Sequence, residues 1–219
     1  MKTWTRRSFL ETSASLVALT ALNSFITKNK KSPKLAFSTL GCPDWTLSQV
    51  VRSAIENGYK GFEIRGLKGE MFLPNCPDFN TSNLPSTLRL LKDNDLKVIN
   101  LGSSANLHFA NEDKRKSNLD EAKRYIDLAQ QLDCPFIRVF PDDFPPDQSV
   151  EKTLDLIISG LVSLADYAKG SNVSILLESH GKVVYKDMLL KIMADANHSK
   201  AGLIWDIFNM WVVTKETPK

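Results

Sequence analysis

From residue 35 onward, the chain alternates short apolar runs with longer amphipathic segments. The apolar runs are rich in Ile, Leu, Val and Phe, and they are too short for helices but long enough for buried strands. Their starts recur every 26 to 39 residues, which predicts repeated βα units, a parallel sheet and the α/β fold class. The six predicted strands are residues 35–40, 61–65, 97–101, 136–140, 174–178 and 202–206.

Amphipathic segments between these runs predict helices. The long third helix is expected to start at Asn118 and to run to Leu132, because an Asn side chain accepts backbone N–H groups at a helix start. The other helices are expected near residues 47–57, 84–93, 149–169 and 184–197.

Two of the predicted strands end in a carboxylate. Glu178 closes the fifth strand and Asp206 closes the sixth, with one predicted helix between them. Such a unit places both side chains at the same end of neighbouring parallel strands, and in a (β/α) barrel that end carries the active site. Two carboxylates at one place repel each other unless a proton or a cation intervenes, so the pair predicts a divalent metal site. The alternative, that both residues only cap loops, is left open by the spacing.

Other polar side chains also follow the predicted strands. Two arginines lie on the second and fourth strands, a histidine lies in the loop after the third, and two polar residues follow the fifth and sixth. The segments before the strands carry turn and cap residues, as is typical of the stability face of a barrel. The expected substrate-binding residues are Arg65, His108, Arg138, His180 and Asn209.

Residues 1–31 predict a targeting segment. Arg6 and Arg7 form a twin-arginine pattern, and residues 14–26 are an apolar stretch that is shorter than a membrane-spanning helix. We expect export to the periplasm by the twin-arginine machinery, with the segment either cleaved or kept as a membrane anchor. The folded domain is then residues 32–219.

The net charge changes when this segment is set aside. The nominal +3 of the whole chain becomes about −2, since residues 32–219 hold 22 basic and 24 acidic side chains. A domain of this charge lacks the basic surface that binds nucleic acid phosphates. We therefore expect a small-molecule partner and no nucleic acid.

The three cysteines show no metal-ligand spacing. Cys134 is expected to be a small buried apolar residue. Cys42 and Cys76 both lie in predicted loops after strands, so a disulfide between them in an exported protein is left open.

Five motifs in chain order carry a resemblance to a known family. Together they resemble the xylose isomerase-like TIM barrels, and among these the sugar phosphate isomerase/epimerase group. The resemblance extends from Leu35 to Trp211 and implies a (β/α)8 barrel, of which this chain would hold about six units. The motifs are STLGCPDW at 38–45, GFEIRG at 61–66, LGSS at 101–104, LLESH at 176–180 and WDIFN at 205–209.

The resemblance implies a divalent ion, which would be Mn, Mg, Co or Zn. Glu178 and Asp206 match two of its four ligands, and the others would be a histidine and a glutamate after two further strands. The resemblance also implies that His180 contacts the substrate near the metal. Many family members have a histidine where this chain has Asn209, which can donate a hydrogen bond but cannot carry a proton.

The implied activity is that of a metal-dependent sugar (phosphate) isomerase or epimerase. A carboxylate such as Glu178 removes a proton from the carbon beside a carbonyl group, which gives an ene-diolate, and a second carboxylate returns the proton. Return to the same carbon is epimerisation, and return to the neighbouring carbon is isomerisation. The substrate would be a sugar or a sugar-derived ketone.

The chain ends at Lys219, which is 13 residues after Asp206. Barrels of this type run to roughly 250 residues, so we expect a truncated version of a longer protein that is inactive by itself. An open sheet has free edges that favour association, and a homo-oligomer is compatible with this.

Three other functions share the predicted fold. A non-catalytic sugar-binding remnant is one, and an inositol-type dehydratase is another. The third, an endonuclease IV-like enzyme acting on abasic DNA, uses a histidine-rich cluster of zinc ions. Only His108 and His180 lie on the expected active face, so the sequence argues against the nuclease.

Overall fold

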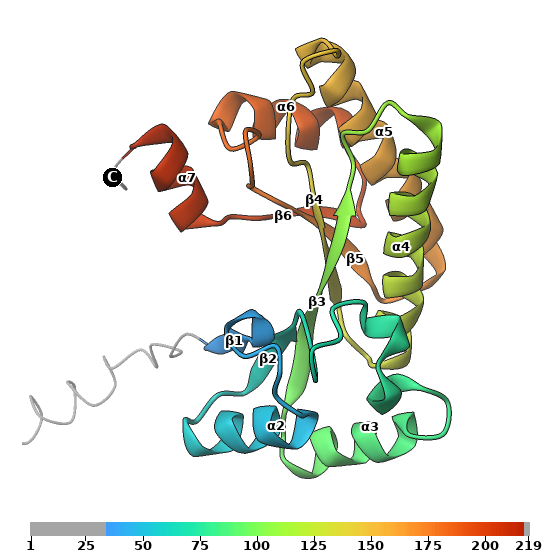
Figure 1. Ribbon diagram of the computed structural model, residues 1–219, viewed down its shortest axis with the longest axis vertical. Helices are drawn as coiled ribbons and strands as arrows, with labels where there is room; N and C mark the ends of the chain where they lie inside the picture. The colour runs from blue at the N-terminus through green and yellow to red at the C-terminus, as the bar shows by residue number, and fades with distance from the viewer. Residues whose placement is uncertain (1–33, 217–219) are drawn as a thin grey trace, which may run out of the picture. The chain divides into compact units, whose positions relative to one another are not determined.

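The computed structural model describes residues 34–216, which are built around one sheet of six parallel strands. Each strand pairs with the next one in the chain, and parallel neighbours of this kind require a crossover between them. Figure 1 shows the helices that precede the last one lying around the outer side of the curved sheet. The predicted α/β fold with repeated βα units is confirmed. The strands are β1 (Ala36–Ser38), β2 (Gly61–Ile64), β3 (Lys97–Asn106), β4 (Phe136–Phe140), β5 (Ser174–Glu178) and β6 (Ala201–Ile204).

The helices begin at local sequence signals. Thr46 and Gln49 form a capping box at the start of α2, and the Ser149 side chain accepts the N–H of Lys152 at the start of α5. Four short 3-10 helices, η1 to η4, cover residues 39–41, 73–75, 77–79 and 168–170. The α-helices are α2 (Leu47–Glu56), α3 (Leu84–Asp93), α4 (Glu112–Gln131), α5 (Val150–Tyr167), α6 (Lys186–Ala196) and α7 (Ile207–Thr214).

The two faces of the sheet differ in chemistry because successive strand residues point to opposite sides. One face is apolar and belongs to the same core as the buried sides of the helices. Glu63, Arg138 and Glu178 alternate with apolar residues along β2, β4 and β5, so they lie on the other face. The fold therefore separates a continuous apolar core from a polar inner face. The apolar face includes Phe62, Ile64, Ile137, Val139, Ile175 and Leu177, all with 0% exposure.

The bounds of four strands differ from the prediction. β2 ends one residue early, at Ile64, and β6 covers Ala201–Ile204, so Asp206 lies two residues past the end of its strand. β1 and β3 differ more. β3 continues to Asn106, past the predicted end at Leu101, because it pairs with β4 as far as Phe140. β1 is shorter than predicted and ends at Ser38, whose side chain accepts the N–H of Leu40 and so starts η1. Pairing with β4 thus sets the end of β3, and side-chain capping by Ser38 sets the end of β1.

The predicted start of the third helix, expected at residues 118–132, is wrong. α4 begins at Glu112, and the cap is Asn111, whose Oδ1 accepts the N–H of Lys114 at 3.0 Å. Asn118 lies inside the helix, where its Oδ1 accepts the N–H of Asn106 at 2.7 Å. Where α4 packs against β3, the Asn118 side chain thus provides the hydrogen-bond acceptor for the last backbone N–H of the strand.

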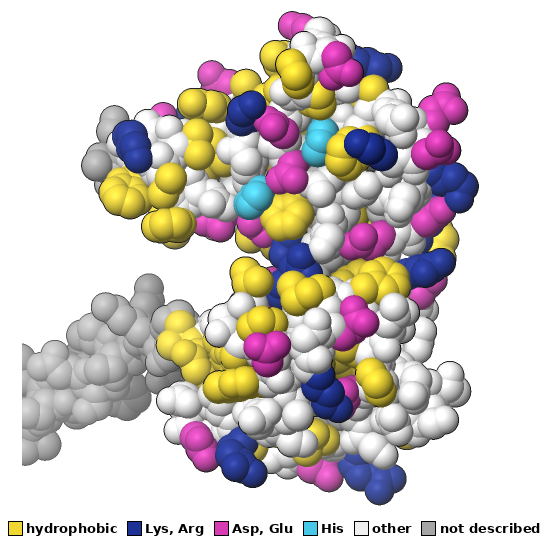
Figure 2. Space-filling view, viewed as in Figure 1, with side chains coloured by type: hydrophobic (Ala, Val, Ile, Leu, Met, Phe, Trp, Pro, Cys, Tyr) yellow, Lys and Arg dark blue, Asp and Glu magenta, His cyan; other side chains and the backbone are white. Residues whose placement is uncertain are grey.

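The last described elements carry an exposed apolar surface. None of the residues of α7 is buried, and Figure 2 shows hydrophobic side chains gathered over this helix. β1 and β6 form the two edges of the sheet within the described residues. Apolar surface beside a strand edge favours association, so the expected homo-oligomer stays a prediction. The exposed residues are Leu203, Trp205, Ile207, Phe208, Trp211, Val212 and Val213.

The predicted targeting segment at residues 1–31 lies outside the described residues. Within residues 34–216, no helix is long and apolar enough to cross a membrane. Cys42, Cys76 and Cys134 are free thiols, so the disulfide left open by the sequence is not formed. Cys134 is buried as predicted, and burial raises its pKa to about 12.

Candidate active site at the carboxyl ends of the strands

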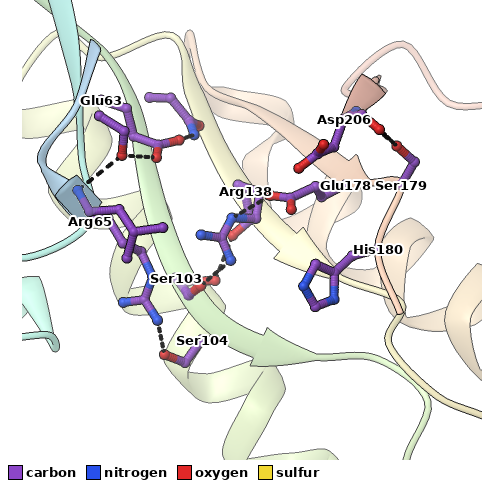
Figure 3. A network of polar contacts seen from close by, with 12 residues as sticks. Glu63, Arg65, Ser103, Ser104, Arg138, Glu178, Ser179, His180 and Asp206 are labelled. Carbon is purple, nitrogen blue, oxygen red and sulfur yellow. Dashed lines mark hydrogen bonds and ion pairs between the residues drawn. The ribbon is translucent and has the colours of Figure 1, made fainter. Parts of the chain in front are cut away.

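An ion pair joins the middle of β4 to the end of the neighbouring strand β5. Arg138 Nε lies 3.1 Å from Glu178 Oε2, and the two side chains are only 4% and 16% exposed. The N–H of Nε does not point at the carboxylate, so the contact is electrostatic and not a hydrogen bond. The register pairs Arg138 with Leu176, so the guanidinium extends along the sheet to reach Glu178. Figure 3 shows the two side chains meeting between the strands.

Further contacts hold Arg138 in place. Its Nη1 donates a hydrogen bond to the carbonyl oxygen of Ser103 at 2.9 Å, and its guanidinium lies 3.8 Å from the centre of the Phe140 ring. Gly102 leaves room for this side chain, because a Cβ there would lie 3.0 Å from Arg138 Nη2 and 2.7 Å from Arg65 Cδ. The arginine is therefore a fixed positive charge beneath Glu178.

Glu63 is a second carboxylate near Arg138, and it was not among the predicted site residues. Its Oε1 accepts a hydrogen bond from Ser38 Oγ at 2.6 Å, and its Oε2 accepts one from Asn100 Nδ2 at 2.5 Å. Figure 3 shows Glu63 and Glu178 on opposite sides of Arg138. A charged residue inside an otherwise apolar strand was the signal that could have revealed it.

The pKa of Glu178 is raised above its ordinary value. Burial is the largest cause, and the negative charges of Asp206 and Glu63 act in the same direction. Arg138 and His180 act in the opposite direction but do not cancel the effect. A raised pKa brings a carboxylate closer to the range in which it can take up and release a proton at neutral pH.

Asp206 is the N-cap of α7. Its Oδ1 accepts the backbone N–H of Asn209 at 2.9 Å, and its Oδ2 accepts Asn209 Nδ2 at 3.0 Å. The backbone N–H of Asp206 donates to Ser179 Oγ at 2.8 Å, which ties the end of β6 to the end of β5. Asp206 is thus a loop cap, although a carboxylate has about four lone-pair positions, so it retains others for a cation.

His180 follows β5 and lies beside Glu178 and Arg138 in Figure 3. Its Nδ1 is 2.7 Å from Asp142 Oδ1, and its ring lies 4.4 Å from the Phe140 ring. Asp142 comes from the loop after β4, and the sequence carried no local signal for a contact between these two loops.

Arg65 and His108 lie in different surroundings. Arg65 Nη2 donates to Ser104 Oγ at 2.7 Å, at the end of the polar inner face. His108 is 7% exposed and packs 4.1 Å from the Phe109 ring, and burial lowers its pKa. Substrate binding by either residue stays a prediction.

The structure therefore brings Glu178, Arg138, His180 and Asp206 together, and Asn209 joins them through Asp206. Within residues 34–216, no group of three or more His, Cys, Asp or Glu side chains is arranged to hold a metal ion. Glu178 and Asp206 can supply two oxygen ligands. Their repulsion contributes to the raised pKa of Glu178, and a cation would relieve it, so the pair fits one side of a divalent metal site.

Solved structures of low sequence identity share this fold. The 3-keto-D-glucoside 4-epimerase YcjR from E. coli is 15% identical with a TM-score of 0.67, covering 84% of this chain and 72% of its own. D-psicose 3-epimerase, crystallised in the presence of D-fructose, is 13% identical with a TM-score of 0.69, and the coverages are 84% and 67%. The IOLI protein with a bound zinc atom is 19% identical with a TM-score of 0.68, and the coverages are 81% and 64%. This chain thus spans about two thirds of the length of these proteins.

Sequence comparisons give the family. A comparison with curated proteins found no match. The family model described as Xylose isomerase-like TIM barrel matches residues 51–218, which is most of the chain. The six parallel βα units are consistent with this match. The chain therefore belongs to the xylose isomerase-like TIM barrel family.

Proposed function

We propose that this protein acts as a metal-dependent sugar isomerase or epimerase, moving a proton at the carbon beside a ketose carbonyl. The observation that carries the proposal is the setting of Glu178, a largely buried carboxylate with a raised pKa among Arg138, His180 and Asp206. Family membership and the likeness to two sugar epimerases support the reaction class.

Glu178 is the proposed base. Its charge is disfavoured by burial and by two neighbouring carboxylates, so taking a proton from carbon relieves both effects. Arg138 is the strongest influence that lowers the pKa of this carboxylate, so it favours the ionised form, and it holds Oε2 in position. With 3% exposure, Arg138 would act through Glu178 and not by touching the sugar.

Glu178 and Asp206 would hold the divalent metal. Both are oxygen ligands, which suit hard and borderline cations. The bound metal would polarise the sugar carbonyl and stabilise the negative charge that develops on its oxygen. Asn209 holds Asp206 by two hydrogen bonds and so orients its carboxylate.

Metal binding is tested with two isosteric variants. Glu178→Gln and Asp206→Asn each remove the charge that a cation needs, and Asn still caps a helix, so α7 is retained. We expect each variant to lower the metal content after dialysis to near background, measured by elemental analysis. Glu151→Gln, at an exposed carboxylate of α5, is the matched control and should bind as the wild type does. Unchanged metal content in both site variants would mean that the two carboxylates only cap strands.

The reaction is tested by solvent deuterium incorporation into D-fructose, D-psicose and further ketoses. Two forms are compared: the 219-residue chain, and the same chain continued by whatever coding sequence follows codon 219. The described residues offer one proton-transfer carboxylate beside the proposed metal, so we expect no exchange from the 219-residue chain. A continued form that supplies the second carboxylate should exchange deuterium with Mn²⁺ or Mg²⁺ and stop when EDTA is added. Turnover by the 219-residue chain would contradict the two-carboxylate mechanism.

A non-catalytic sugar-binding protein is the second candidate. The observation in its favour is that both carboxylates of the site already have partners, Arg138 for Glu178 and Asn209 for Asp206. If the continued form binds sugars but exchanges no protons with any ketose, this second function is the correct one.

A further inference from the structure

One side-chain pair links the loop after β4 to the loop after β5. Asp142 Oδ1 lies 2.7 Å from His180 Nδ1, and the two side chains are 29% and 37% exposed. An ionised carboxylate only accepts hydrogen bonds, so the hydrogen in this contact belongs to Nδ1. The contact therefore determines which ring nitrogen of His180 carries the proton.

The backbone of the two loops holds this pair in place. The N–H of Lys182 donates to the carbonyl oxygen of Asp142 at 2.9 Å. Gly181 has a φ of 62°, and a Cβ at this position would overlap the Asp142 carbonyl, so the close approach requires glycine. Asp142 itself has a φ of 58°, a conformation that Asp and Asn tolerate better than most residues. The position of the carboxylate is thus built by both loops.

The ring of His180 is held from a second side. It lies 4.4 Å from the Phe140 ring, which also contacts the guanidinium of Arg138 at 3.8 Å. A positive charge on His180 would lower the pKa of Glu178, so the imidazole lies within electrostatic range of the proposed base. Two contacts, with Asp142 and with Phe140, therefore determine the orientation of the ring. Figure 3 shows the ring itself near Glu178 and Arg138.

We propose that Asp142 is a positioning residue that holds His180 as the Nδ1–H tautomer and leaves Nε2 as a hydrogen-bond acceptor. In the neutral ring the Nε2 lone pair is then available to a group that donates, such as a sugar hydroxyl, and not to a carbonyl oxygen. The choice of a sugar hydroxyl rests on the proposed function, whereas the tautomer does not. Histidines are often held in one tautomer in this way, by a carboxylate or a backbone carbonyl group that accepts the N–H of one ring nitrogen.

Nitrogen NMR of the chain labelled with ¹⁵N-histidine reads the tautomer directly. The spectra are recorded without substrate and at a pH above which the nitrogen shifts no longer change, so that neutral rings are compared. In a neutral ring the protonated nitrogen and the lone-pair nitrogen resonate far apart. Since the chain has three histidines, the loss of one pair of signals in His180→Gln assigns the ring.

Asp142→Asn is the decisive variant. An amide can donate as well as accept, so it no longer selects one tautomer, and its backbone tolerates the same φ. We expect the wild-type ring to be protonated at Nδ1, and Asp142→Asn to move the tautomer ratio toward Nε2–H by roughly tenfold or more, since a charge-assisted hydrogen bond is lost. Asp143→Asn is the matched control, because it removes the neighbouring carboxylate, which pairs with Lys182 at 2.8 Å, and should leave the ratio unchanged.

Two results would overturn the proposal: a wild-type ring protonated at Nε2, or an unchanged ratio in Asp142→Asn. Either result leaves the ketose exchange experiment unaffected. Conversely, the absence of proton exchange would remove the proposed reaction but leave the tautomer assignment in place. The two proposals therefore fail separately.

Discussion

Replacing Arg138 with methionine is expected to lower the free energy of unfolding by about 3–5 kcal/mol, because removing one partner of a buried ion pair leaves the other charge uncompensated. Arg138 is 3% exposed and lies 3.1 Å from the Glu178 carboxylate. Methionine fills a similar length of space, so the loss reports the missing charge. Urea unfolding followed by circular dichroism measures it.

Two further variants separate charge from packing. Arg89→Met, at an exposed position on α3, should change the unfolding free energy by no more than about 0.5 kcal/mol. The double variant Arg138→Met with Glu178→Gln should recover most of the loss, because a neutral amide needs no cation. If the double variant is as unstable as Arg138→Met alone, the loss comes from the contacts with Ser103 and Phe140 and not from the ion pair.

The pH dependence of this loss has a definite sign. In the folded chain the pKa of Glu178 is above its ordinary value of about 4.3. At pH values between the pKa of Glu178 in the unfolded chain and its higher pKa in the folded chain, the folded state holds more protons than the unfolded state. The contribution of Glu178 to the free energy of unfolding therefore falls as the pH rises through this range. Arg138 is the strongest influence that lowers the pKa, so removing it raises the pKa of Glu178 further. The loss in Arg138→Met should therefore be larger at neutral pH than below about pH 4.

Glu178→Gln is expected to reduce deuterium exchange in a catalytically active form by about 10²- to 10⁴-fold, the range that general base catalysis contributes. The amide has the same shape but cannot accept the proton from carbon. Exchange into the ketose that the wild type uses fastest is followed by NMR, and Glu151→Gln is the control with an expected rate equal to that of the wild type.

Excess metal distinguishes the two roles of Glu178. If Glu178 is the base, saturating Mn²⁺ should refill the site in Glu178→Gln without restoring exchange. Restoration of exchange by added metal would show that Glu178 is only a ligand, and another residue would then be the base.

The elements of this fold could be predicted where the signals are local. The strand at 136–140 and the helix at 84–93 have their predicted bounds, because apolar periodicity and strand length act over a few residues. The placement of Glu178 and Asp206 at the ends of neighbouring strands follows from the same pattern. Local signals were insufficient for the start of α4: the predicted cap, Asn118, instead accepts the N–H of Asn106 at the end of β3, and the helix is capped by Asn111.

The partners of the site residues required the tertiary structure. The pairing of Arg138 with Glu178 depends on the register of β4 against β5, which no single strand specifies. The contact of Asp142 with His180 depends on two loops that are 38 residues apart and meet through the backbone at Gly181. Periodicity along the chain thus determined which residues reach the carboxyl ends of the strands. Which of them touch was decided by register and loop docking, because these depend on contacts between segments distant in sequence.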